Sequence, residues 1–552
     1  MRKILAGRRS SGGDTPFKMK IDTTITDSYA GGAGTPSATD SFYFPIFDGT
    51  DREGYAISFT IDWGDSTTSN VNSTNYATSC SHQYTTGGEY TISATGSIAG
   101  FNFYAMRNTT GKADGNKLIE IEEWGDLKLT GGGSTGWNEG NVFARCKNLT
   151  EVSASDIPKF PLTSTGSENI YGSKGLFNMY VSTTSTVSAL TTINNIANWN
   201  VSGVANMEDM FSGCVSLEFG TTSNGDIDLS LWNVSYVTTF ENMFKRCSVF
   251  DPTALFIGYN IGKDTVGSSI TMRAMFNDAA VFNCDISDWD TVSVNNMNYM
   301  FTGATAFNQD INTSSVTVGG ITYNAWRVSN VTNMFGMFFN AESFNEPIGN
   351  WNVSSVTKME YMFYNATSFN QPIGNWNVSS VTGMEFMFRY ASSFNQPIGN
   401  WNVSNVNDMQ YMFNYAYNFD QPIGDWDVSN VTKMQFMLAT GNFAEPMAFN
   451  RDISQWDVSN VKDMSYMFRL ATSFDQDIGD WDVGEVTKMQ FMFYYAEDFN
   501  ADIGDWDTIL VEDMQYMFSS ATSFNQDINE KNSGGIFPPY RAWDTSKVTN
   551  MK

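Results

Sequence analysis

A segment of 25 residues recurs along most of this chain, and this recurrence limits the folds that it can adopt. Residues 344–368 read FNEPIGNWNVSSVTKMEYMFYNATS, residues 369–393 read FNQPIGNWNVSSVTGMEFMFRYASS, and residues 394–418 read FNQPIGNWNVSNVNDMQYMFNYAYN. The element M-x-x-M-F begins at Met207, Met272, Met297, Met334, Met359, Met384, Met409, Met464, Met489 and Met514. Such short units cannot bury their apolar faces alone, so we expect roughly 14 of them to stack into one array.

Each unit contains a pattern for one short strand and one short helix. Trp376 and Val378 are two residues apart, which places both on one face of a strand, while Asn377 faces the other way. Ser379 can cap a helical turn. The apolar residues that follow have helical spacing: Val381, Met384, Met387, Phe388 and Ala391. The repeats therefore predict an α/β solenoid with one parallel strand and one helix per unit.

The region before the repeats has a different pattern. ISFTIDWGDSTTS (57–69) alternates apolar and polar residues before a turn, and HQYTTGGEYTISATG (82–96) repeats the pattern around Gly-Gly. We therefore expect an all-β sandwich at 18–115, a flexible basic arm at 1–17 and the repeat array at 116–552.

Composition and charge exclude several classes of function. The 552 residues are 41% hydrophobic, enough for a large core, and carry 59 acidic against 31 basic residues. A net charge of −28 should repel nucleic acid and anionic membranes. No apolar run reaches the ~18–20 residues of a membrane helix, and the first residues lack the apolar region of roughly 7–15 residues found in an export signal.

The five cysteines favour core positions over a disulfide framework. Cys146, Cys214 and Cys247 each lie three residues after a phenylalanine, where the regular repeats carry alanine. Cysteine is thus expected to replace a small buried residue there. The disulfide interpretation is less favoured.

An enzymatic function has little support in the sequence. His82 is the single histidine, and the expected sandwich gives it a structural role beside a turn. The chain lacks a Cys/His metal cluster, a phosphate-binding loop and a nucleophile elbow. Carboxylates are abundant enough for a glycosidase-like pair, but they recur at repeat positions rather than in one unique place. We therefore expect no enzyme and no cofactor.

Two outward positions beside each Trp change from amide to carboxylate along the array. They are Asn350/Asn352, Asn375/Asn377, Asn400/Asn402, Asp425/Asp427, Gln455/Asp457, Asp480/Asp482 and Asp505/Asp507. Stacked asparagines can form a hydrogen-bonded ladder, whereas stacked carboxylates repel and could bind Ca²⁺. The simpler alternative is an acidic solvated face whose side chains bond to neighbouring turns.

An aromatic residue precedes the second Met of most repeats. The members are Tyr361, Phe386, Tyr411, Phe436, Tyr466, Phe491 and Tyr516. On an ideal helix Phe386 lies about 160° from the centre of the apolar stripe, so these rings should lie outside the main core. They could pack laterally and seal the convex surface. They could also form an exposed stripe for a glycan or protein, with the contact candidates Tyr411, Phe436, Tyr466 and Phe491.

Both regions resemble known families. The repeat W-[ND]-V-S-x-V-x-x-M-x-x-M-F resembles BspA-like leucine-rich-repeat surface proteins over roughly residues 117–552. IDWGDSTT followed by HQYTTGGEYTI resembles a PKD-type immunoglobulin-like domain, with Ser66 in place of a usual glycine. Proteins with this pairing occur on bacterial surfaces and in tailed phages, so the resemblance implies binding or adhesion.

The expected function is host-surface recognition by a virion protein of a tailed phage, such as a fibre, spike or capsid-surface appendage. The reason is a surface-type architecture without an evident export signal. The basic arm and the sandwich would contact other virion proteins, and the repeats would bind a host glycan or protein, with a homo-oligomer also open. The alternative is a bacterial cell-surface adhesin exported by another route.

Overall fold

The structure is a computed structural model that describes residues 15–25, 40–46, 57–98, 101–103, 114–127, 129, 141–160, 175–179, 188–218, 229–252, 254–255, 261–262, 269–528 and 543–550. The chain divides into two compact units, Met1–Tyr236 and Val237–Lys552, and each is described by itself. Most of the predicted arm 1–17 lies outside the described residues. The predicted boundaries after residues 17 and 115 stay predictions.

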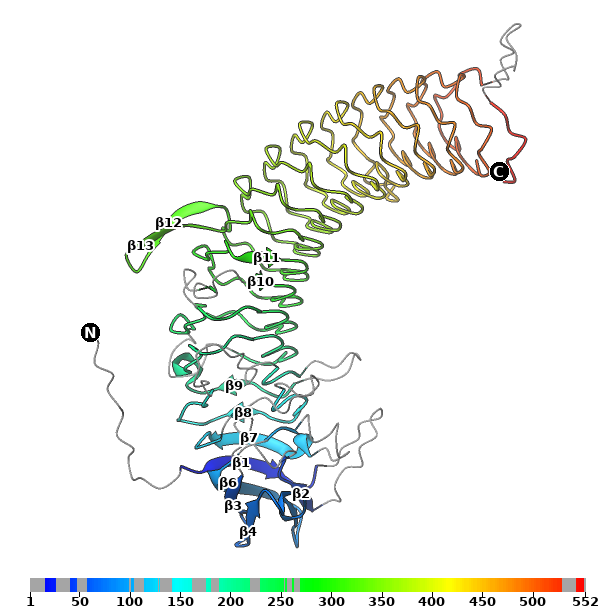
Figure 1. Cartoon of the computed structure of the whole chain (residues 1–552). Coiled ribbons are helices and arrows are strands. Elements are labelled where there is room, and N and C mark those ends of the chain that lie inside the picture. The colour runs from blue at the N-terminus through cyan, green and yellow to red at the C-terminus, as the bar shows by residue number, and fades with distance from the viewer. Residues whose placement is uncertain are drawn as a thin grey trace. The chain divides into compact units, whose positions relative to one another are not determined.

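The first unit contains a seven-stranded sheet (Figure 1). In spatial order its strands are β4 (Thr68–Asn72), β3 (Ser58–Asp62), β6 (Glu89–Ser97), β1 (Phe17–Asp22), β7 (Leu118–Glu123), β8 (Glu151–Val152) and β9 (Thr192–Ile193). The pairs from β4 to β7 are antiparallel, whereas β7, β8 and β9 are parallel. A second, antiparallel pair is formed by β2 (Ser41–Tyr43) and β5 (Ser81–Gln83).

The strands before the repeats form because apolar and polar residues alternate along them. β1 buries Phe17, Met19 and Ile21, while Lys18 and Lys20 point the other way and stay half-buried. β3 likewise alternates, with Phe59 and Ile61 buried. One apolar and one polar face are what an antiparallel sheet with one covered side requires.

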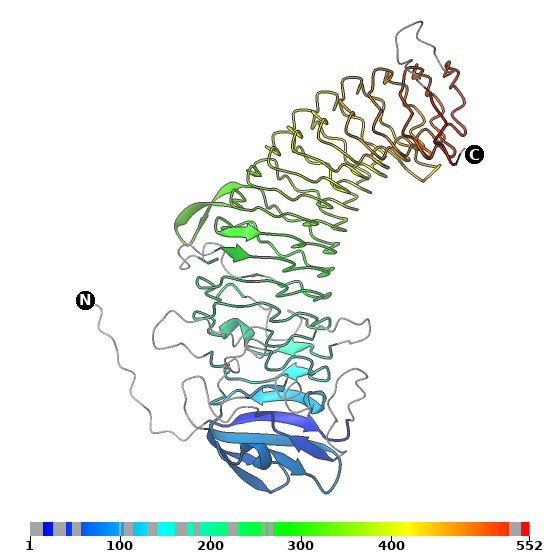
Figure 2. The same ribbon diagram turned by 45° about the vertical axis from the view of Figure 1, so that its right-hand side comes forward.

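The predicted helix in each repeat, and with it the leucine-rich-repeat-like α/β solenoid, is wrong. Among the described residues, helix is limited to α1 (Tyr76–Ser79), η1 (Gly115–Lys117), η3 (Ile196–Asn198) and the single residue Phe103. Each repeat unit, called a coil below, is a series of turns, and the coils of the second unit follow one another in chain order (Figure 2). Strands, turns and a large sheet therefore make the described part of this protein, with almost no helix.

The turns explain why helical spacing misled the prediction. In the coil around residues 384–391, the N–H of Met387 bonds to the carbonyl of Met384 at 3.2 Å, and the N–H of Ala391 bonds to that of Phe388 at 3.0 Å. Such three-residue steps put apolar residues on one side, as a helix would. Phe386, however, has a φ of 60°, and a left-handed residue ends any helix.

Backbone hydrogen bonds that a helix would make within a segment run instead between coils. Every second N–H of residues 384–390 donates to the next coil at 2.9–3.1 Å: Met384 to Asp408, Phe386 to Gln410, Phe388 to Met412 and Tyr390 to Asn414. This satisfies groups that could not be buried unpaired.

Parallel bridges link the coils at the residue before the first Met of M-x-x-M-F. This position, called the bridge position below, runs through Asn296, Asn333, Lys358, Gly383, Asp408, Lys433, Asp463, Lys488, Asp513 and Asn550. Upstream, β10 (Ile270–Thr271) and β11 (Val294–Asn296) pair here as short parallel strands. The strand predicted around W-[ND]-V is therefore wrong, because the parallel pairing of these coils lies at the bridge position instead.

The core consists of stacked copies of the same side chains. Trp376 is 3% exposed and Asn377 is exposed, as predicted. Neighbouring Trp rings of the second unit lie 6.2–6.5 Å apart and nearly parallel. The core phenylalanines form a second stack, with Phe363 and Phe388 5.5 Å apart. Each coil thus covers the apolar face of the next.

Insertions and cysteines fit around this core. One insertion forms the antiparallel hairpin β12 (Ser314–Val318) and β13 (Ile321–Ala325), whose Gly319 and Gly320 have φ of 58° and 81°, as a two-residue hairpin turn favours. The insertion at 529–542 lies outside the described residues.

All five cysteines are free and buried, which confirms the core interpretation. Among the described residues, no helix is long and apolar enough to cross a membrane.

Candidate recognition surface

The aromatic residues before the second Met form one stack, called the aromatic column below. Its rings lie nearly parallel, 4.2–4.7 Å apart, from Tyr361 to Phe491. Tyr516 extends the column at 5.1 Å with a tilt of 40°. The regular spacing follows from one ring per coil at the same backbone position.

The four predicted contact residues lie in the middle of this column. Tyr411, Phe436, Tyr466 and Phe491 are all half-buried, because each ring covers its neighbours but keeps part of its surface in solvent. The structure therefore brings them together, and it also gives them the lateral packing of the simpler interpretation. Their contact with a ligand stays a prediction.

The backbone of the column is in an unfavourable conformation. From Tyr361 to Tyr516 its members have φ between 53° and 61°. A left-handed residue other than glycine costs about 1–2 kcal/mol, and asparagine tolerates it better than a bulky aromatic residue. Among the described residues asparagine takes this position at Asn242, with a φ of 55°, and at Asn141 in the first unit, with a φ of 60°. The rings therefore stand where smaller residues would fit the backbone better.

The coils lie closer together at the aromatic column than at the Trp stack. Ring separations are 4.2–4.7 Å in the column and 6.2–6.5 Å between Trp rings such as Trp376 and Trp401. The coils must then fan out from the column, so the column lies on the inner side of their stack. The convex placement expected from the sequence is thus wrong, because it assumed a helix on that side.

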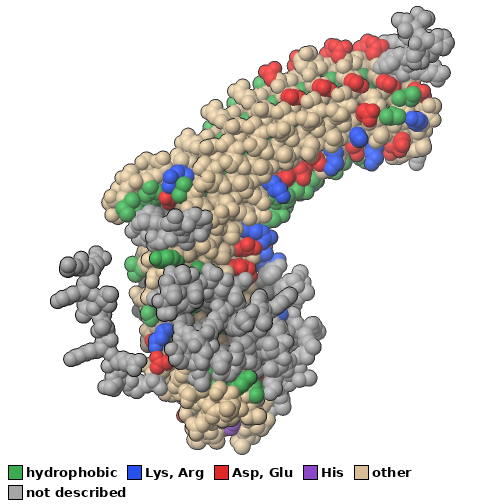
Figure 3. Space-filling model, viewed as in Figure 1, with side chains coloured by type: hydrophobic (Ala, Val, Ile, Leu, Met, Phe, Trp, Pro, Cys, Tyr) green, Lys and Arg blue, Asp and Glu red, His purple; other side chains and the backbone are tan. Residues whose placement is uncertain are grey.

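Charged groups flank the column. From Asp408 to Asp513 the bridge position alternates between aspartate and lysine. Lys433 pairs with Asp408 at 2.7 Å, and Lys488 lies 3.9 Å from Asp463. Figure 3 shows blue, red and green side chains mixed along the lower edge of the later coils in view, whereas red ones dominate the upper edge. The column therefore borders a face of mixed charge on an acidic protein.

Arg389 joins the charged and aromatic groups. Its guanidinium carbon lies 4.8–5.7 Å from the centres of four rings: Tyr364, Phe386, Tyr390 and Tyr411. Its Nε donates to Asn414 Oδ1 at 3.0 Å. Cation–π contacts of this kind hold a cation within the aromatic face.

The outward acids beside Trp serve their own turns. Asp427 Oδ1 accepts the backbone N–H of Ser429 at 3.1 Å, and Asp457 accepts that of Ser459 at 3.1 Å. The hydrogen bonds from the Ser459 hydroxyl and N–H lower the pKa of Asp457. Among the described residues, no group of three or more His, Cys, Asp or Glu could hold a metal ion. The geometry therefore favours turn stabilisation over the Ca²⁺ site.

An asparagine ladder does exist, but at a position that the sequence analysis did not select. The residue after the second core Phe accepts, through its side-chain oxygen, the backbone N–H of the same position one coil later. The links are Asn345 to Asn370, Asn370 to Asn395, Asn395 to Asp420, Asp420 to Asn450, Asn450 to Asp475, Asp475 to Asn500 and Asn500 to Asn525, all at 2.8–3.1 Å. In the sequence, the recurring F-[ND] pair could have indicated this ladder.

The column is interrupted in the earlier coils of the second unit. Ala274 and Gly336 occupy the column position there, on either side of Tyr299 along the stack. A cavity of about 510 Å³ opens at this place. Its lining consists of Lys245, Arg273, Ala274, Asn277, Tyr299, Thr302, Phe335, Phe339 and Tyr361. In the sequence, two small residues within an otherwise aromatic series could have indicated this cavity.

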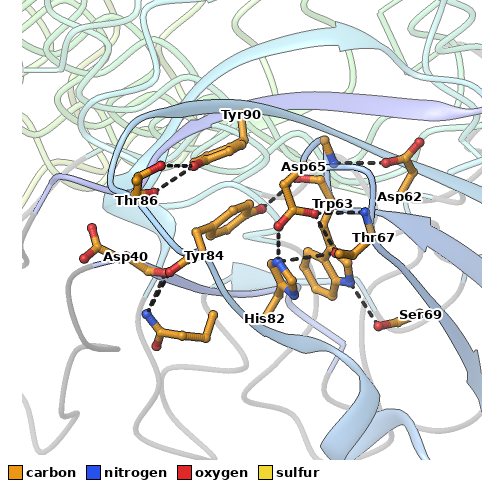
Figure 4. Close-up of polar contacts among 12 residues, drawn as sticks. Asp40, Asp62, Trp63, Asp65, Thr67, Ser69, His82, Tyr84, Thr86 and Tyr90 are labelled. Atoms are coloured by element: carbon orange, nitrogen blue, oxygen red, sulfur yellow. Dashed lines mark hydrogen bonds and ion pairs between the residues drawn. The ribbon is translucent and has the colours of Figure 1, made fainter.

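His82 lies in the first unit and belongs to a structural network (Figure 4). Its Nε2 is 2.7 Å from Asp65 Oδ2, and its ring stacks on Trp63 at 5.0 Å. Burial opposes ionisation of Asp65, but hydrogen bonds from Thr67 and His82 outweigh it and lower the pKa of that carboxyl. Ser66 has a φ of 73°, a conformation that favours glycine. The arrangement fixes a turn, as the sequence predicted for His82.

One family model matches the repeats. It is described as Mycoplasma protein of unknown function, DUF285, and it matches residues 185–255, 219–320, 252–366, 314–424, 368–448 and 440–552. The comparison with curated proteins gave no match, and the comparison with solved structures gave none. The overlapping matches run without a break from residue 185 to residue 552, about two thirds of the chain. The chain therefore belongs to the DUF285 repeat family.

Proposed function

We propose that this protein is a non-enzymatic recognition protein, displayed on a surface, whose repeat array binds a glycan or protein of a target cell. The aromatic column carries this proposal. It keeps half-buried rings, in continuous register, on the inner side of the coil stack, at positions where the backbone alone would favour smaller residues. Repeat arrays commonly bind through extended concave surfaces of this kind.

Stacked rings suit such a task physically. Aromatic side chains concentrate binding energy at interfaces because they offer large, rigid surfaces at little entropic cost. Arg389 and the alternating charges of the bridge position add directional contacts beside them. The rings therefore supply affinity, and the charges select the partner.

We place the protein on the virion of a tailed phage, with the basic arm and the β-rich first unit attached to other virion proteins. The PKD-like pattern around Trp63 and His82 and the BspA-like repeat motif support a surface role, since both resemble surface proteins. A bacterial cell-surface adhesin is the second candidate, because the family model is described from Mycoplasma, a bacterium. Antibodies to the repeats would label purified particles in the first case and intact cells in the second.

The binding role is tested by removing the rings without changing the backbone. Tyr411, Phe436, Tyr466 and Phe491 are replaced together by asparagine, which tolerates the left-handed conformation and occupies the same position at Asn242. The matched control replaces Asn400, Asp425 and Asp480, which are exposed beside the Trp stack, by alanine. Both proteins are first checked by thermal melting and hydrogen exchange.

Binding is then measured on an array of bacterial envelope polysaccharides and on whole cells. The parent and the control should bind the same target, and the ring-free variant should lose at least tenfold in affinity. A folded ring-free variant that binds like the parent would show that the column only packs the coils together.

A further inference from the structure

The aromatic column is interrupted at Ala274 and Gly336, and the residues around this gap form a cavity. In the later coils a ring covers the column position, but Ala274 has only a methyl group and Gly336 has none. A Cβ at Gly336 would lie 3.0 Å from Cδ1 and Cε1 of Tyr299, so the Tyr299 ring lies close against this glycine. The ring of Tyr299 therefore lies on the Gly336 side, and no ring fills the space beside Ala274.

The walls of this cavity are aromatic. Phe335 meets Tyr299 and Tyr361, each at 5.2 Å, and bridges the gap between the two tyrosines. Phe339 stacks on Tyr364 at 4.4 Å and closes the next side. The cavity volume of about 510 Å³ falls within the range of roughly 300–1,000 Å³ that small-molecule sites occupy.

The charged groups of the lining are both cations. Lys245 and Arg273 reach the cavity from successive coils, although the whole chain carries a net charge of −28. Arg273 forms an ion pair through Nη1 with the Glu241 carboxylate, so its remaining N–H groups and the Lys245 ammonium are the donors for an anion. Asn277 and Thr302 add an amide and a hydroxyl group, and the Thr302 hydroxyl donates to the Gly336 carbonyl at 2.7 Å, which leaves its oxygen able to accept. An anion is therefore favoured here, beside groups that bind hydroxyls.

We propose that this cavity, called the column gap, binds a carboxylated sugar residue of an acidic glycan. A pyranose ring would stack its C–H face on Tyr299 or Phe335, its carboxylate would pair with Arg273 and Lys245, and its hydroxyls would bond to Asn277 and Thr302. The proposal deepens the proposed function by naming a ligand class for one part of the same face, and it rests on that function for the source of the glycan.

Filling the column gap gives the sharpest test. Ala274 has a φ of 52°, so Ala274→Tyr places the residue of the later coils in the same backbone conformation and fills the cavity. A second variant, Arg273→Gln with Lys245→Gln, removes the charges and keeps the space. The matched control is Lys462→Gln, which removes an exposed cation of a later coil that lies outside the gap and outside the bridge position.

Binding is measured by calorimetry with a galacturonate trisaccharide, with a neutral galactose trisaccharide and with a glutamate hexapeptide. The parent and Lys462→Gln should bind the galacturonate at least tenfold more tightly than the other two probes. Ala274→Tyr should bind none of them, and the double Gln variant should lose the preference for the charged sugar. Equal binding of charged and neutral sugars, stronger binding of the peptide, or undiminished binding by Ala274→Tyr would each overturn the proposal.

The two proposals can fail separately. Both proposals stand, at different places on the face, if three results are found together. Ala274→Tyr no longer binds the galacturonate, Ala274→Tyr still binds to target cells, and the ring-free variant does not bind to those cells. If the galacturonate does not bind the parent and cell binding still needs the rings, the column gap is refuted alone. If the galacturonate binds the gap but cells bind every variant equally, the proposed function fails.

Discussion

The indole nitrogen of Trp401 donates a hydrogen bond to the carbonyl oxygen of Ile373, one coil earlier, at 3.1 Å. The same oxygen accepts the backbone N–H of Trp376 at 3.1 Å. One carbonyl group therefore joins a turn of its own coil to the core of the next, and the arrangement recurs at other Trp positions, for example Trp426 on Ile398. This contact explains why most coils of the second unit keep a tryptophan where another large apolar residue would fill similar space.

Trp401→Phe should remove the indole hydrogen bond while it keeps most of the bulk of the ring. The lost bond should cost about 0.5–1.5 kcal/mol, because the Ile373 carbonyl keeps its other donor. Trp401→Ala should cost about 3–5 kcal/mol, because it also leaves a cavity between two coils. Urea unfolding gives both values. Hydrogen exchange should show faster exchange in the coils on both sides, and an effect limited to one coil would contradict a shared core.

Asn395→Ala should remove one link of the asparagine ladder. Its Oδ1 accepts the N–H of Asp420 at 3.0 Å and the side-chain N–H of Gln421 at 2.8 Å. Leaving a partly buried N–H without its acceptor should cost about 1–3 kcal/mol. Asn395→Asp keeps the acceptor, as Asp420 does in the next coil, and should change stability much less. A thermal melt compares the two, with Asn400→Ala as an exposed control.

The sequence predicted the stacking but not the backbone that produces it. Exact repetition of Trp376, Val378, Phe388 and Ala391 was enough to predict buried, coil-spanning stacks, since a recurring apolar residue must meet its own copy. The helix failed because turns of three residues give the same apolar spacing. Nothing in residue type marks Phe386 as left-handed, since aromatic residues rarely adopt that conformation.

Phe386→Gly and Phe386→Ala should differ because of that conformation. Both substitutions remove the ring and its contacts with Tyr361 and Tyr411 at 4.5 and 4.6 Å. Only glycine adopts a φ of 60° without strain, so Phe386→Gly should be the more stable variant by about 1 kcal/mol. Chemical denaturation measures the difference. A more stable Ala variant would mean that residue 386 is not left-handed in solution.

The candidate surface was predictable in part. The aromatic series pointed to Tyr411, Phe436, Tyr466 and Phe491 because it repeats outside the main apolar pattern, and the structure joins them in one stack. Its place on the inner side of the coils could not be predicted, since that depends on spacing differences between stacks. The column gap was missed, although Ala274 and Gly336 stand out as small residues once the repeats are aligned on the aromatic series.

Glu360 and Glu385 should make the stability of the repeats depend on pH. Burial raises the pKa of both carboxyls, and for Glu385 the neighbouring carboxylates of Glu360 and Asp408 raise it further. The later coils carry neutral glutamine at the same position, for example Gln410. A proton is then bound more tightly in the folded than in the unfolded chain. The contribution of these two carboxyls to the free energy of unfolding is therefore highest below the unfolded pKa of about 4.3 and falls as the pH rises through the folded values.

Glu360→Gln with Glu385→Gln should remove this part of the pH dependence. The double variant should gain stability over the parent as the pH rises from 4 to 7, because the parent alone must ionise two partly buried carboxyls. Urea unfolding of the full chain at a series of pH values measures the gain. Glu497→Gln, at an exposed position, is the control and should leave the profile unchanged. A gain that is the same at every pH would show that the glutamines improve packing or hydrogen bonding, and that the carboxyls of Glu360 and Glu385 titrate alike in the folded and unfolded chain.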